Sequence, residues 1–313
     1  MDLSVIILNW NTCALLEKCL HSLECPQPGI VFEVLVVDNA SEDGSREMVR
    51  DLFPHVRLKV NPTNIGFGAG NNSGISGTAG RYILFLNSDT VVLEGSLSRL
   101  VQYADSRPEV GIVGPKLLNE DGSLQYSCRR YPSLGAGFFR NTPLGRLFPH
   151  NRYAADYLMQ DWDHSEPRDV DWVSGAALMI RRRLVEQIGA FDEDFFMYCE
   201  DVDLCWRANH APHPDLPGQN WRVAYYPGAV IYHFIGKSSD QVPTRMTYEF
   251  HRSQYLFYKK HYAASMFPLL RPLIPVGIAA RAVGQLVRYQ WRNWKKRLRG
   301  EPLSPHHRRG GDR

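Results

Sequence analysis

The sequence lacks the signatures of several common protein classes. None of its six cysteines forms a C-x-x-C pair, which disfavours a zinc or dithiol redox site. The N-terminus enters an apolar, strand-like segment without a charged region and a cleavable apolar run, so we expect no secretory signal. Free thiols in a reducing cytoplasm are then the expected state of the cysteines. No internal repeat is present, which excludes solenoid and propeller architectures.

Long uncharged apolar runs are also scarce. The best candidate, residues 266–286, is interrupted by three prolines and two arginines. A membrane-spanning helix needs about 20 mostly apolar residues. From the sequence we therefore expect no membrane span.

Charge is distributed unevenly along the 313 residues. Residues 288–313 carry nine Lys/Arg and two acidic residues, a net charge of +7, whereas the other 287 residues carry 27 basic and 31 acidic groups. Trp291 and Trp294 lie within the basic stretch, a combination typical of helices at an anionic membrane surface. A solvated tail or a helix packed on its own domain are the alternatives. We expect peripheral attachment to the inner face of the cell membrane and no nucleic acid partner.

Strand-like and helical segments alternate over the first 115 residues. Apolar runs at 3–8, 31–37, 56–60 and 82–86 are followed by helical patterns at 12–23, 45–53, 66–75 and 97–104. This order predicts an α/β fold with a mainly parallel central sheet flanked by helices. We divide the chain into a nucleotide-sugar-binding half (1–115), an acceptor-binding and catalytic half of the same domain (116–262) and a basic amphipathic helical extension (263–313).

Polar residues follow successive strands at Asn9, Asp38, Asn61 and Asn87. In parallel sheets, ligands bind beyond the carboxyl ends of the strands, so these residues outline one crevice. The Asp38 carboxylate could accept hydrogen bonds from a nucleotide base or ribose. A simple turn of Asp38 and Asn39 with the residues that follow is the alternative.

The glycine-rich segment 64–72 reads N-I-G-F-G-A-G-N-N. It is not the dinucleotide fingerprint, because Asn71 stands where the third glycine belongs, and this disfavours an NAD-dependent dehydrogenase. Glycines such as Gly66 that open a helix still permit backbone N–H groups to approach an anion. Close packing of helix on sheet is the alternative.

The segment Y-I-L-F-L-N-S-D-T at 82–90 projects Asn87 and Asp89 from the sheet edge. A departing diphosphate needs its charge neutralised, which Mg²⁺ or Mn²⁺ on one or two carboxylates supplies. We assign Asp89 to the metal and Asn87 to the ribose or the metal shell; an Asx-turn is the alternative. His233, at another strand end, could complete the metal site, and Lys237 or Ser238 could meet phosphate.

Three carboxylates gather at Glu200, Asp201 and Asp203 among aromatic residues. Crowded carboxylates in an apolar setting have raised pKa values, as a general base requires. We assign Asp201 as the base and Glu200 as the second choice. The alternative is an acidic first helical turn, which the helix dipole favours.

Taken together, these motifs resemble the family-2 glycosyltransferases of the GT-A fold over roughly residues 3–260. The order matches S-V-I-I-L-N-W-N, V-V-D-N-A-S-E-D-G-S, N-I-G-F-G-A-G-N-N, L-N-S-D-T, W-V-S-G-A-A-L-M-I-R-R, the F-D-E-D-F-F-M-Y-C-E-D-V-D-L-C-W-R run and H-F-I-G-K-S. S-C-R-R-Y-P-S at 127–133 and E-D-V-D-L are similar to bacterial rhamnosyltransferase-like members, whose donor is commonly dTDP-rhamnose.

The resemblance implies a role for each matching residue. Asp38 would hold the nucleotide base, Asp89 the metal and His233 the metal or diphosphate, while Asp201 would be the base catalyst. The acceptor side would be lined by Trp172, Ser174 and Gly175. One departure is Asn87, which replaces the first aspartate of the family's D-x-D motif and leaves one carboxylate for the metal. The Q-x-x-R-W motif of processive synthases is absent, which favours addition of a single sugar.

The resulting expectation is an inverting, metal-dependent transfer of a sugar, best guess L-rhamnose from dTDP-rhamnose, to an acceptor hydroxyl. The acceptor would be a saccharide or lipid-linked saccharide of cell-envelope polysaccharide or glycolipid synthesis. A sugar-phosphate nucleotidyltransferase is one alternative, but it needs a basic residue near the first strand and residues 4–12 contain none. A non-catalytic protein that binds sugar nucleotides is another alternative. Such a protein could keep Asp38 and lose Asp201, whereas here every candidate catalytic position is filled.

Overall fold

The computed structural model describes residues 1–132, 152–234 and 243–299. Its centre is a ten-stranded sheet in which eight strands follow the order β3-β2-β1-β4-β11-β6-β12-β5, while β7 pairs with β6 and β9 with β12. The strands of this sheet are β1 Leu3–Asn9, β2 Phe32–Asp38, β3 Arg57–Val60, β4 Tyr82–Asn87, β5 Thr90–Val92, β6 Val110–Leu118, β7 Leu124–Gln125, β9 Arg168–Asp169, β11 Ala177–Arg181 and β12 Arg222–His233. A separate two-stranded sheet pairs β8 Cys128–Arg129 with β10 Trp172–Val173.

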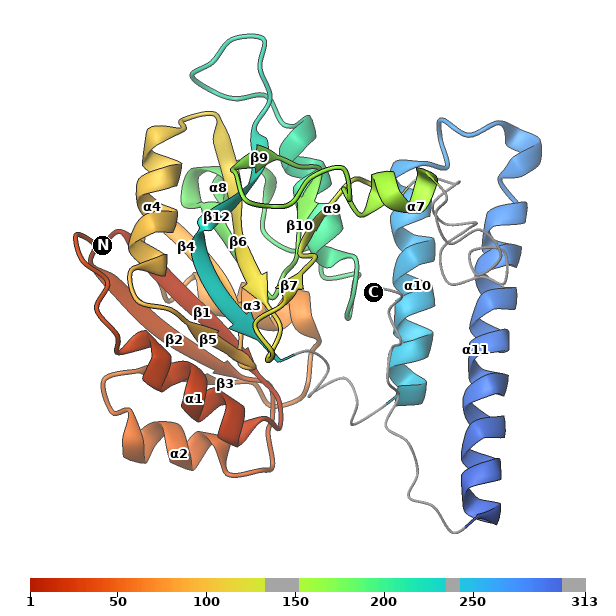
Figure 1. Ribbon diagram of the computed structural model, residues 1–313, viewed down its shortest axis with the longest axis horizontal. Helices are drawn as coiled ribbons and strands as arrows, with labels where there is room; N and C mark the ends of the chain where they lie inside the picture. The colour runs from red at the N-terminus through yellow and green to blue at the C-terminus, as the bar shows by residue number, and fades with distance from the viewer. Residues whose placement is uncertain (133–151, 235–242, 300–313) are drawn as a thin grey trace.

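Helices cover both faces of the large sheet (Figure 1). They are α1 Cys13–Leu23, α2 Ser45–Leu52, α3 Phe67–Ile75, α4 Ser96–Ser106, α7 Arg152–Tyr157, α8 Arg182–Ile188, α9 Glu200–His210, α10 Pro243–His261 and α11 Leu273–Leu298, with a 3₁₀ turn at Pro268–Leu270. Alternate residues of β1 serve opposite faces: Leu3, Val5 and Ile7 pack in the core beneath α1 and α4, whereas Ile6 joins the core beneath α9. Both cores are therefore built on one sheet.

The predicted α/β class with a central sheet flanked by helices is confirmed. The strands β3, β2, β1 and β4 are parallel, as are β6 and β12. The sequence analysis did not anticipate that β11 enters between β4 and β6 antiparallel to both. From the sequence, the region of β12 reads as two short strands, at residues 221–226 and 230–233. The structure has one strand whose register shifts between Tyr226 and Val230, where the apolar pattern is broken by Pro227 and Gly228.

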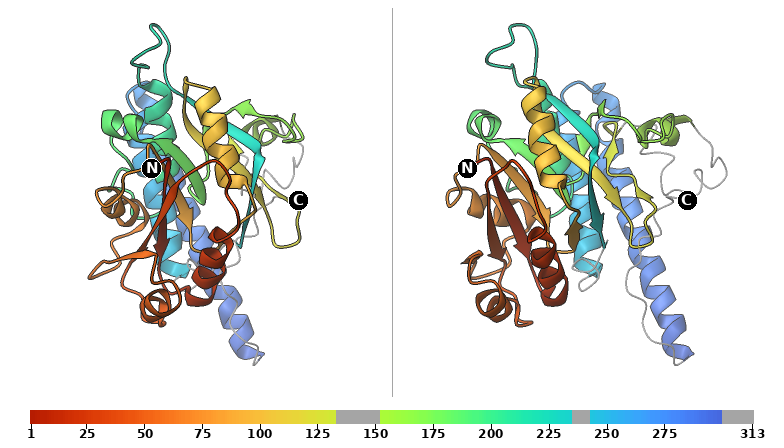
Figure 2. Two further views of the ribbon diagram at one scale, coloured as in Figure 1. Left: turned by 90° about the vertical axis from the view of Figure 1, so that its left-hand side faces the viewer. Right: turned by 60° about the vertical axis from the view of Figure 1, so that its left-hand side comes forward.

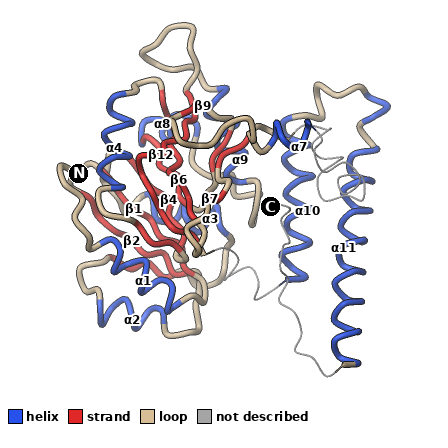
Figure 3. Tube along the Cα trace, viewed as in Figure 1, coloured by secondary structure: helices blue, strands red, loops and turns tan. Residues whose placement is uncertain are grey.

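The C-terminal helices α10 and α11 form an antiparallel hairpin beside the main body (Figures 1 and 3). Helix α10 lies next to the body, and α11 packs on α10 and extends past the body at one end (Figure 2). The Arg281 guanidinium of α11 donates to the Gln254 side chain of α10 at 3.3 Å. The opposite side of α11 is exposed.

By length and composition alone, the segment Pro268–Leu298 meets the requirement for crossing a membrane, which the sequence analysis did not expect. The reason is the position of the prolines. Pro268 begins the 3₁₀ turn and Pro272 immediately precedes α11, and Pro275 falls in its first turn, where a missing N–H breaks no helical hydrogen bond. The helix therefore runs uninterrupted for 26 residues.

Candidate active site

The carboxyl ends of β1, β2 and β4 are joined by buried side chains. The Asn9 amide donates to the Asp38 carboxylate at 3.2 Å and to the Ser41 hydroxyl at 3.1 Å. The Thr12 hydroxyl donates to Asn9 Oδ1 at 2.7 Å and lies 2.8 Å from the Ser88 hydroxyl in the loop after β4. Three strand ends thus share one hydrogen-bonded floor.

Asp38 is almost fully buried within this floor. Its Oδ1 accepts the Ser41 N–H at 3.0 Å and lies 3.6 Å from Arg46 Nε, while Oδ2 accepts from Asn9. Arg46 is partly exposed and lies at the mouth of the same crevice. The carboxylate therefore has internal partners, and its charge is balanced by Arg46.

Asn39 and Gly66 connect this floor to more distant loops. The Asn39 amide donates to the Gly66 carbonyl at 3.0 Å and accepts from Asn61 at 3.0 Å. Gly66 has φ +94°, and a Cβ there would lie 2.5 Å from the carbonyl oxygen of Phe196. Only glycine permits that approach, which brings the start of α3 against the loop before α9. Asn71 is buried in α3 and donates to the Phe67 carbonyl of its own helix.

Asp89 and His233 face each other across the pairing of β5 with β12. His233 pairs with Thr90 in the ladder, and its Nε2 lies 3.3 Å from Asp89 Oδ1 and 3.4 Å from the Asn87 amide. Two neighbouring ligands of an octahedral ion with bonds of about 2.1 Å are about 3.0 Å apart, so the two atoms fit a divalent cation. Within the described ranges no group of three or more His, Cys, Asp or Glu residues is arranged to hold a metal ion. Other ligands would therefore come from amides, diphosphate oxygens or water. Lys237 and Ser238 lie outside the described residues.

Asp201 lies in the first turn of α9, next to the same strand ends. Its Oδ2 accepts the Gly175 N–H at 2.9 Å, and its Oδ1 accepts the Val202 N–H at 2.8 Å. One residue along, the Ala176 carbonyl accepts the Asn87 N–H at 2.9 Å. Two hydrogen bonds through the 174–177 turn therefore connect Asp201 to the end of β4, which leads to Asp89.

Asp201 and Glu200 differ in their exposure. Asp201 is partly exposed, whereas Glu200 is 5% exposed and its Oε2 has no hydrogen-bond partner among the described residues. Burial raises the pKa of both carboxyls, and the charge of Asp201 raises the pKa of Glu200 further. Hydrogen bonds from Gly175 and Val202 counteract the rise at Asp201. Burial therefore favours the neutral form of Glu200, while Asp201 is the more exposed of the two carboxyls.

The residues assigned to the acceptor lie on β10 and in the turn after it. Trp172 is largely buried and donates its indole N–H to the Arg130 carbonyl at 2.9 Å. The Ser174 N–H donates to the Ser127 carbonyl, and Gly175 contacts Asp201. Of the three residues, Gly175 is the one that contacts Asp201, and Trp172 and Ser174 precede it on the same segment.

Sequence reasoning gave Arg129 no role of its own. Its guanidinium lies over the rings of Trp172 and Tyr157, 5.5 Å and 5.6 Å from their centres, and its charge favours the ionised form of Asp201. The S-C-R-R-Y-P-S motif was noted, but nothing in the spacing from 129 to 201 indicates that the two residues meet. The pairing of β8 with β10 puts Arg129 opposite Trp172, and helix α9 packs against β10, so the charge of Arg129 acts on Asp201.

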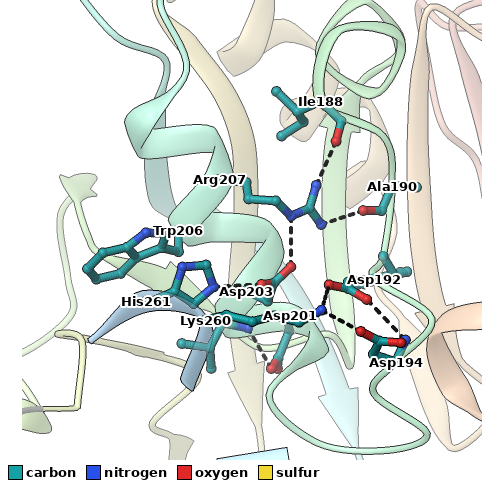
Figure 4. Close-up of polar contacts among 12 residues, drawn as sticks. Ile188, Ala190, Asp192, Asp194, Asp201, Asp203, Trp206, Arg207, Lys260 and His261 are labelled. Atoms are coloured by element: carbon teal, nitrogen blue, oxygen red, sulfur yellow. Dashed lines mark hydrogen bonds and ion pairs between the residues drawn. The ribbon is translucent and has the colours of Figure 1, made fainter. Parts of the chain in front are cut away.

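Helix α9 is fixed by a second set of ionic contacts, shown in Figure 4. The Asp203 carboxylate is 1% exposed and accepts from Arg207 at 2.7 Å and from His261 of α10 at 2.7 Å. Arg207 also donates to the carbonyls of Ile188 and Ala190 at 2.8 Å and 2.5 Å. Lys260 of α10 pairs with Asp192 and Asp194 in the loop before α9. Both the helix and the loop that carry the base are therefore attached to α10.

Comparisons with known proteins agree with this arrangement. The model of the family described as Glycosyl transferase family 2 matches residues 4–189. An N-acetylglucosaminyl-diphospho-decaprenol L-rhamnosyltransferase of Mycobacterium tuberculosis is 33% identical over 266 residues, 82% of this chain and 83% of that protein. The rhamnosyltransferase WbbL of Escherichia coli is 29% identical over 55% of this chain and 69% of its own.

Among solved structures, the mannosyltransferase PcManGT from Pyrobaculum calidifontis, in complex with GDP-Man and Mn²⁺, superposes with a TM-score of 0.52 at 17% identity. The match covers 92% of this chain and 75% of that one, and at this identity it supports the fold alone. The GT-A fold expected from the motifs is confirmed. The protein is a glycosyltransferase that belongs to glycosyl transferase family 2.

Proposed function

We propose that the protein transfers L-rhamnose from dTDP-rhamnose to a hydroxyl of a lipid-linked saccharide in cell-envelope synthesis, with inversion at the anomeric carbon. We take the sugar and the acceptor class from the mycobacterial relative, an L-rhamnosyltransferase whose acceptor is N-acetylglucosaminyl-diphospho-decaprenol. The geometric observation that carries the reaction type is the short hydrogen-bonded path from Asp201 through Gly175 and Ala176 to Asn87. This path supports the proposal that Asp201 acts as a base next to the strand ends where a nucleotide diphosphate would bind.

The proposed reaction is a single displacement. The acceptor oxygen attacks the anomeric carbon from the face opposite the diphosphate, and its proton passes to Asp201 as the new C–O bond forms. The bond from the anomeric carbon to the diphosphate oxygen breaks, and both its electrons leave with the nucleotide. Asp201 suits this task because burial raises its pKa while the Gly175 and Val202 N–H groups hold the carboxylate in place. The neighbouring carboxyl, Glu200, is buried, and we propose no nucleophilic role for it.

On the donor side, Asn9, Asp38, Asn39, Gly66 and Asn71 are proposed to form or support the nucleotide site. Asp89 and His233, with Asn87 beside them, would hold Mg²⁺ or Mn²⁺, and an imidazole ligand favours the transition ion Mn²⁺. When bound there, the ion supplies positive charge to the departing diphosphate. Trp172, Ser174 and Gly175 are proposed to border the acceptor.

The exposed side of α11 supports a membrane location. Seven apolar side chains at helical spacing, each more than half exposed, form a stripe along it: Leu273, Val276, Val283, Val287, Trp291, Trp294 and Leu298. Lys295 lies over the Trp291 ring at 3.7 Å, so positive charge is next to the aromatic end of the stripe. We propose that this stripe lies on the anionic cytoplasmic leaflet, where a lipid-linked acceptor would be found.

A ligand panel tests the proposed donor. Thermal unfolding is recorded with dTDP, UDP, GDP and NAD, each with and without Mn²⁺, since a ligand that binds only the native state raises the melting temperature. Metal-dependent stabilisation by dTDP is expected. Stabilisation by UDP or GDP alone would mean that the donor is a UDP-sugar or a GDP-sugar and not dTDP-rhamnose. A response to NAD alone would contradict the transferase mechanism.

Product analysis tests the chemistry. With dTDP-rhamnose and a polyprenyl-diphosphate-linked GlcNAc acceptor, one rhamnose should be added with inverted anomeric configuration. Retention of configuration would exclude the single displacement. Activity with nucleoside triphosphate and sugar phosphate would instead show a nucleotidyltransferase.

A further inference from the structure

Gln125 contacts the imidazole of His233 on the side away from Asp89. It ends β7, which pairs with β6 through Leu117. Its Oε1 lies 2.7 Å from His233 Nδ1. The remaining ring nitrogen, Nε2, is the atom that faces Asp89 and Asn87.

The orientation of the Gln125 amide is fixed by its other neighbours. Its nitrogen lies 3.3 Å from the backbone carbonyl oxygen of His233, which can only accept a hydrogen bond. The same nitrogen donates to Asn119 Oδ1 at 2.9 Å. The Asn119 amide is in turn directed by the Leu124 carbonyl, 3.4 Å from its nitrogen, and by the Ser123 hydroxyl at 2.9 Å. Two backbone carbonyls therefore direct Gln125 Oε1 toward the imidazole.

This orientation determines which ring nitrogen carries hydrogen. Because Oε1 accepts, Nδ1 of His233 must donate, and in the neutral ring Nε2 then carries a lone pair. That lone pair accepts the Asn87 amide N–H at 3.4 Å, and it lies 3.3 Å from Asp89 Oδ1, so two acceptors face each other without a hydrogen between them. Such a pair attracts a cation. With the amide reversed, Nε2–H would donate to Asp89 and tie up both proposed ligands.

We propose that Gln125, oriented by Asn119, is a positioning residue that holds His233 in the Nδ1–H tautomer and so keeps Nε2 available to a divalent cation. The inference rests on the proposed metal dependence of the transfer. It gives a role to β7 and the 119–125 hairpin, neither of which takes part in the transfer reaction itself. Partners of this kind beside a ligating histidine are worth about 10-fold to 100-fold in metal affinity.

The tautomer can be measured without metal. The full-length protein labelled with ¹⁵N-histidine is studied by long-range ¹H–¹⁵N correlation at neutral pH, and His233 is assigned from the spectrum of His233→Asn. The wild type should show a protonated Nδ1 and an unprotonated Nε2. A protonated Nε2 in the wild type would overturn the proposal.

Two variants of Gln125 separate positioning from folding. Gln125→Leu removes the acceptor, and the His233 signals should shift toward the Nε2–H form or a mixture. Gln125→Glu keeps an acceptor opposite Nδ1, and the Nδ1–H form should persist. Gln102→Leu, at an exposed position of α4, is the matched control and should change nothing. An unchanged tautomer in Gln125→Leu would refute the role of Gln125.

Metal affinity gives the second readout. Mn²⁺ is titrated into the dTDP-bound protein and the free ion is followed by electron paramagnetic resonance. Binding should weaken by about 10-fold or more in Gln125→Leu and stay within about 3-fold in Gln125→Glu. Equal affinity in all three proteins would overturn the proposal. Absence of Mn²⁺ binding by the wild type would refute the metal site of the proposed function. The tautomer measurement is made without metal and is therefore independent of that result.

Discussion

His261 at the end of α10 donates a 2.7 Å hydrogen bond to Asp203, two residues beyond the proposed base Asp201. The Asp203 carboxylate is 1% exposed and the His261 side chain 11% exposed, so the contact is shielded from water. Arg207 accompanies it from one helical turn away. The C-terminal hairpin and the catalytic helix are therefore joined by a buried polar contact rather than by apolar packing alone.

Removing the Asp203 carboxylate should destabilise the protein strongly. Asp203→Ala leaves Arg207 and His261 without their shared partner, and breaking a buried pair in this way costs about 3 kcal/mol. Urea denaturation measures the change in the free energy of unfolding. As a control, Asp161→Ala removes an exposed ion pair with Arg168 and should cost below about 1 kcal/mol. Equal effects of the two substitutions would contradict the importance of burial.

The same contact predicts a pH dependence. Burial alone would raise the pKa of Asp203, but the hydrogen bond from His261 and the charge of Arg207 outweigh it and hold the pKa below its usual value. A lowered pKa stabilises the folded state at pH values above the unfolded pKa of about 3.9, and this stability is lost as the pH falls through the folded pKa. The difference in unfolding free energy between wild type and Asp203→Asn should thus be full at pH 7. It should shrink below about pH 4, and a constant difference down to pH 3 would show that Asp203 is not the titrating group.

Asp201→Asn should abolish transfer while dTDP binding persists. General base catalysis contributes about 10²-fold to 10⁴-fold, and the amide keeps the shape of the side chain. Glu200→Gln is the matched control, because Glu200 is buried with a raised pKa and the amide keeps the shape of its side chain, and it should retain activity within about 3-fold. The measurement is the transfer rate of the wild type and both variants at saturating donor and acceptor. The reverse ranking of the two variants would make Glu200 the base, and lost nucleotide binding in Asp201→Asn would make Asp201 a ligand or a structural residue.

The activity of the wild type should rise with pH along a limb set by the base. Since burial raises the pKa of Asp201, the midpoint of this limb should lie above the ordinary aspartate value of 3.8. The measurement is kcat/KM against pH, which reports the free enzyme. A limb at or below 3.8 would argue against a buried carboxylate as the base.

Removal of residues 288–313 should release the protein from anionic vesicles. The deletion takes away Trp291, Trp294 and most of the basic cluster, and each basic residue near such a surface is worth about 1 kcal/mol. Co-sedimentation with vesicles containing phosphatidylserine should fall by at least about 10-fold. Trp291→Ala with Trp294→Ala separates the aromatic contribution from the charge. Unchanged partitioning of the deletion variant would refute the membrane role of this segment.

Much of the nucleotide half could be predicted from the sequence because its signals are local. The apolar run at 82–86 and the polar residues after it became β4 and the Asn87–Asp89 turn, since a buried strand and a turn each follow from neighbouring residues. The segment 244–261 also looks helical in the sequence, and the structure has α10 at Pro243–His261. Strand β6 was missed because it carries Gly111, Gly114 and Pro115, which are typical of loops. Its burial between β11 and β12 overrides that tendency.

Contacts between distant residues could not be predicted. His261 is 58 residues from Asp203, and neither position has a pattern that points to the other. Gln125 is 108 residues from His233, and only the pairing of β7 and β12 with β6 brings them into contact. The relative exposure of Glu200 and Asp201 was not predicted either. The two side chains leave the helix about 100° apart, and the structure buries Glu200 and leaves Asp201 partly exposed.

The buried floor formed by Asn9, Thr12, Ser41 and Ser88 has a thermodynamic consequence for the donor site. Its hydrogen bonds are already formed in the free protein. The loops after β1, β2 and β4 are therefore ordered by folding, and the loss of their conformational entropy is part of the folding free energy. A nucleotide bound there as proposed would have no loop to order at this end of the sheet, and its contact energy would be retained as affinity. If Thr12 or Ser41 were substituted, these loops would become ordered only when the nucleotide binds. The entropy lost on ordering would then weaken nucleotide binding.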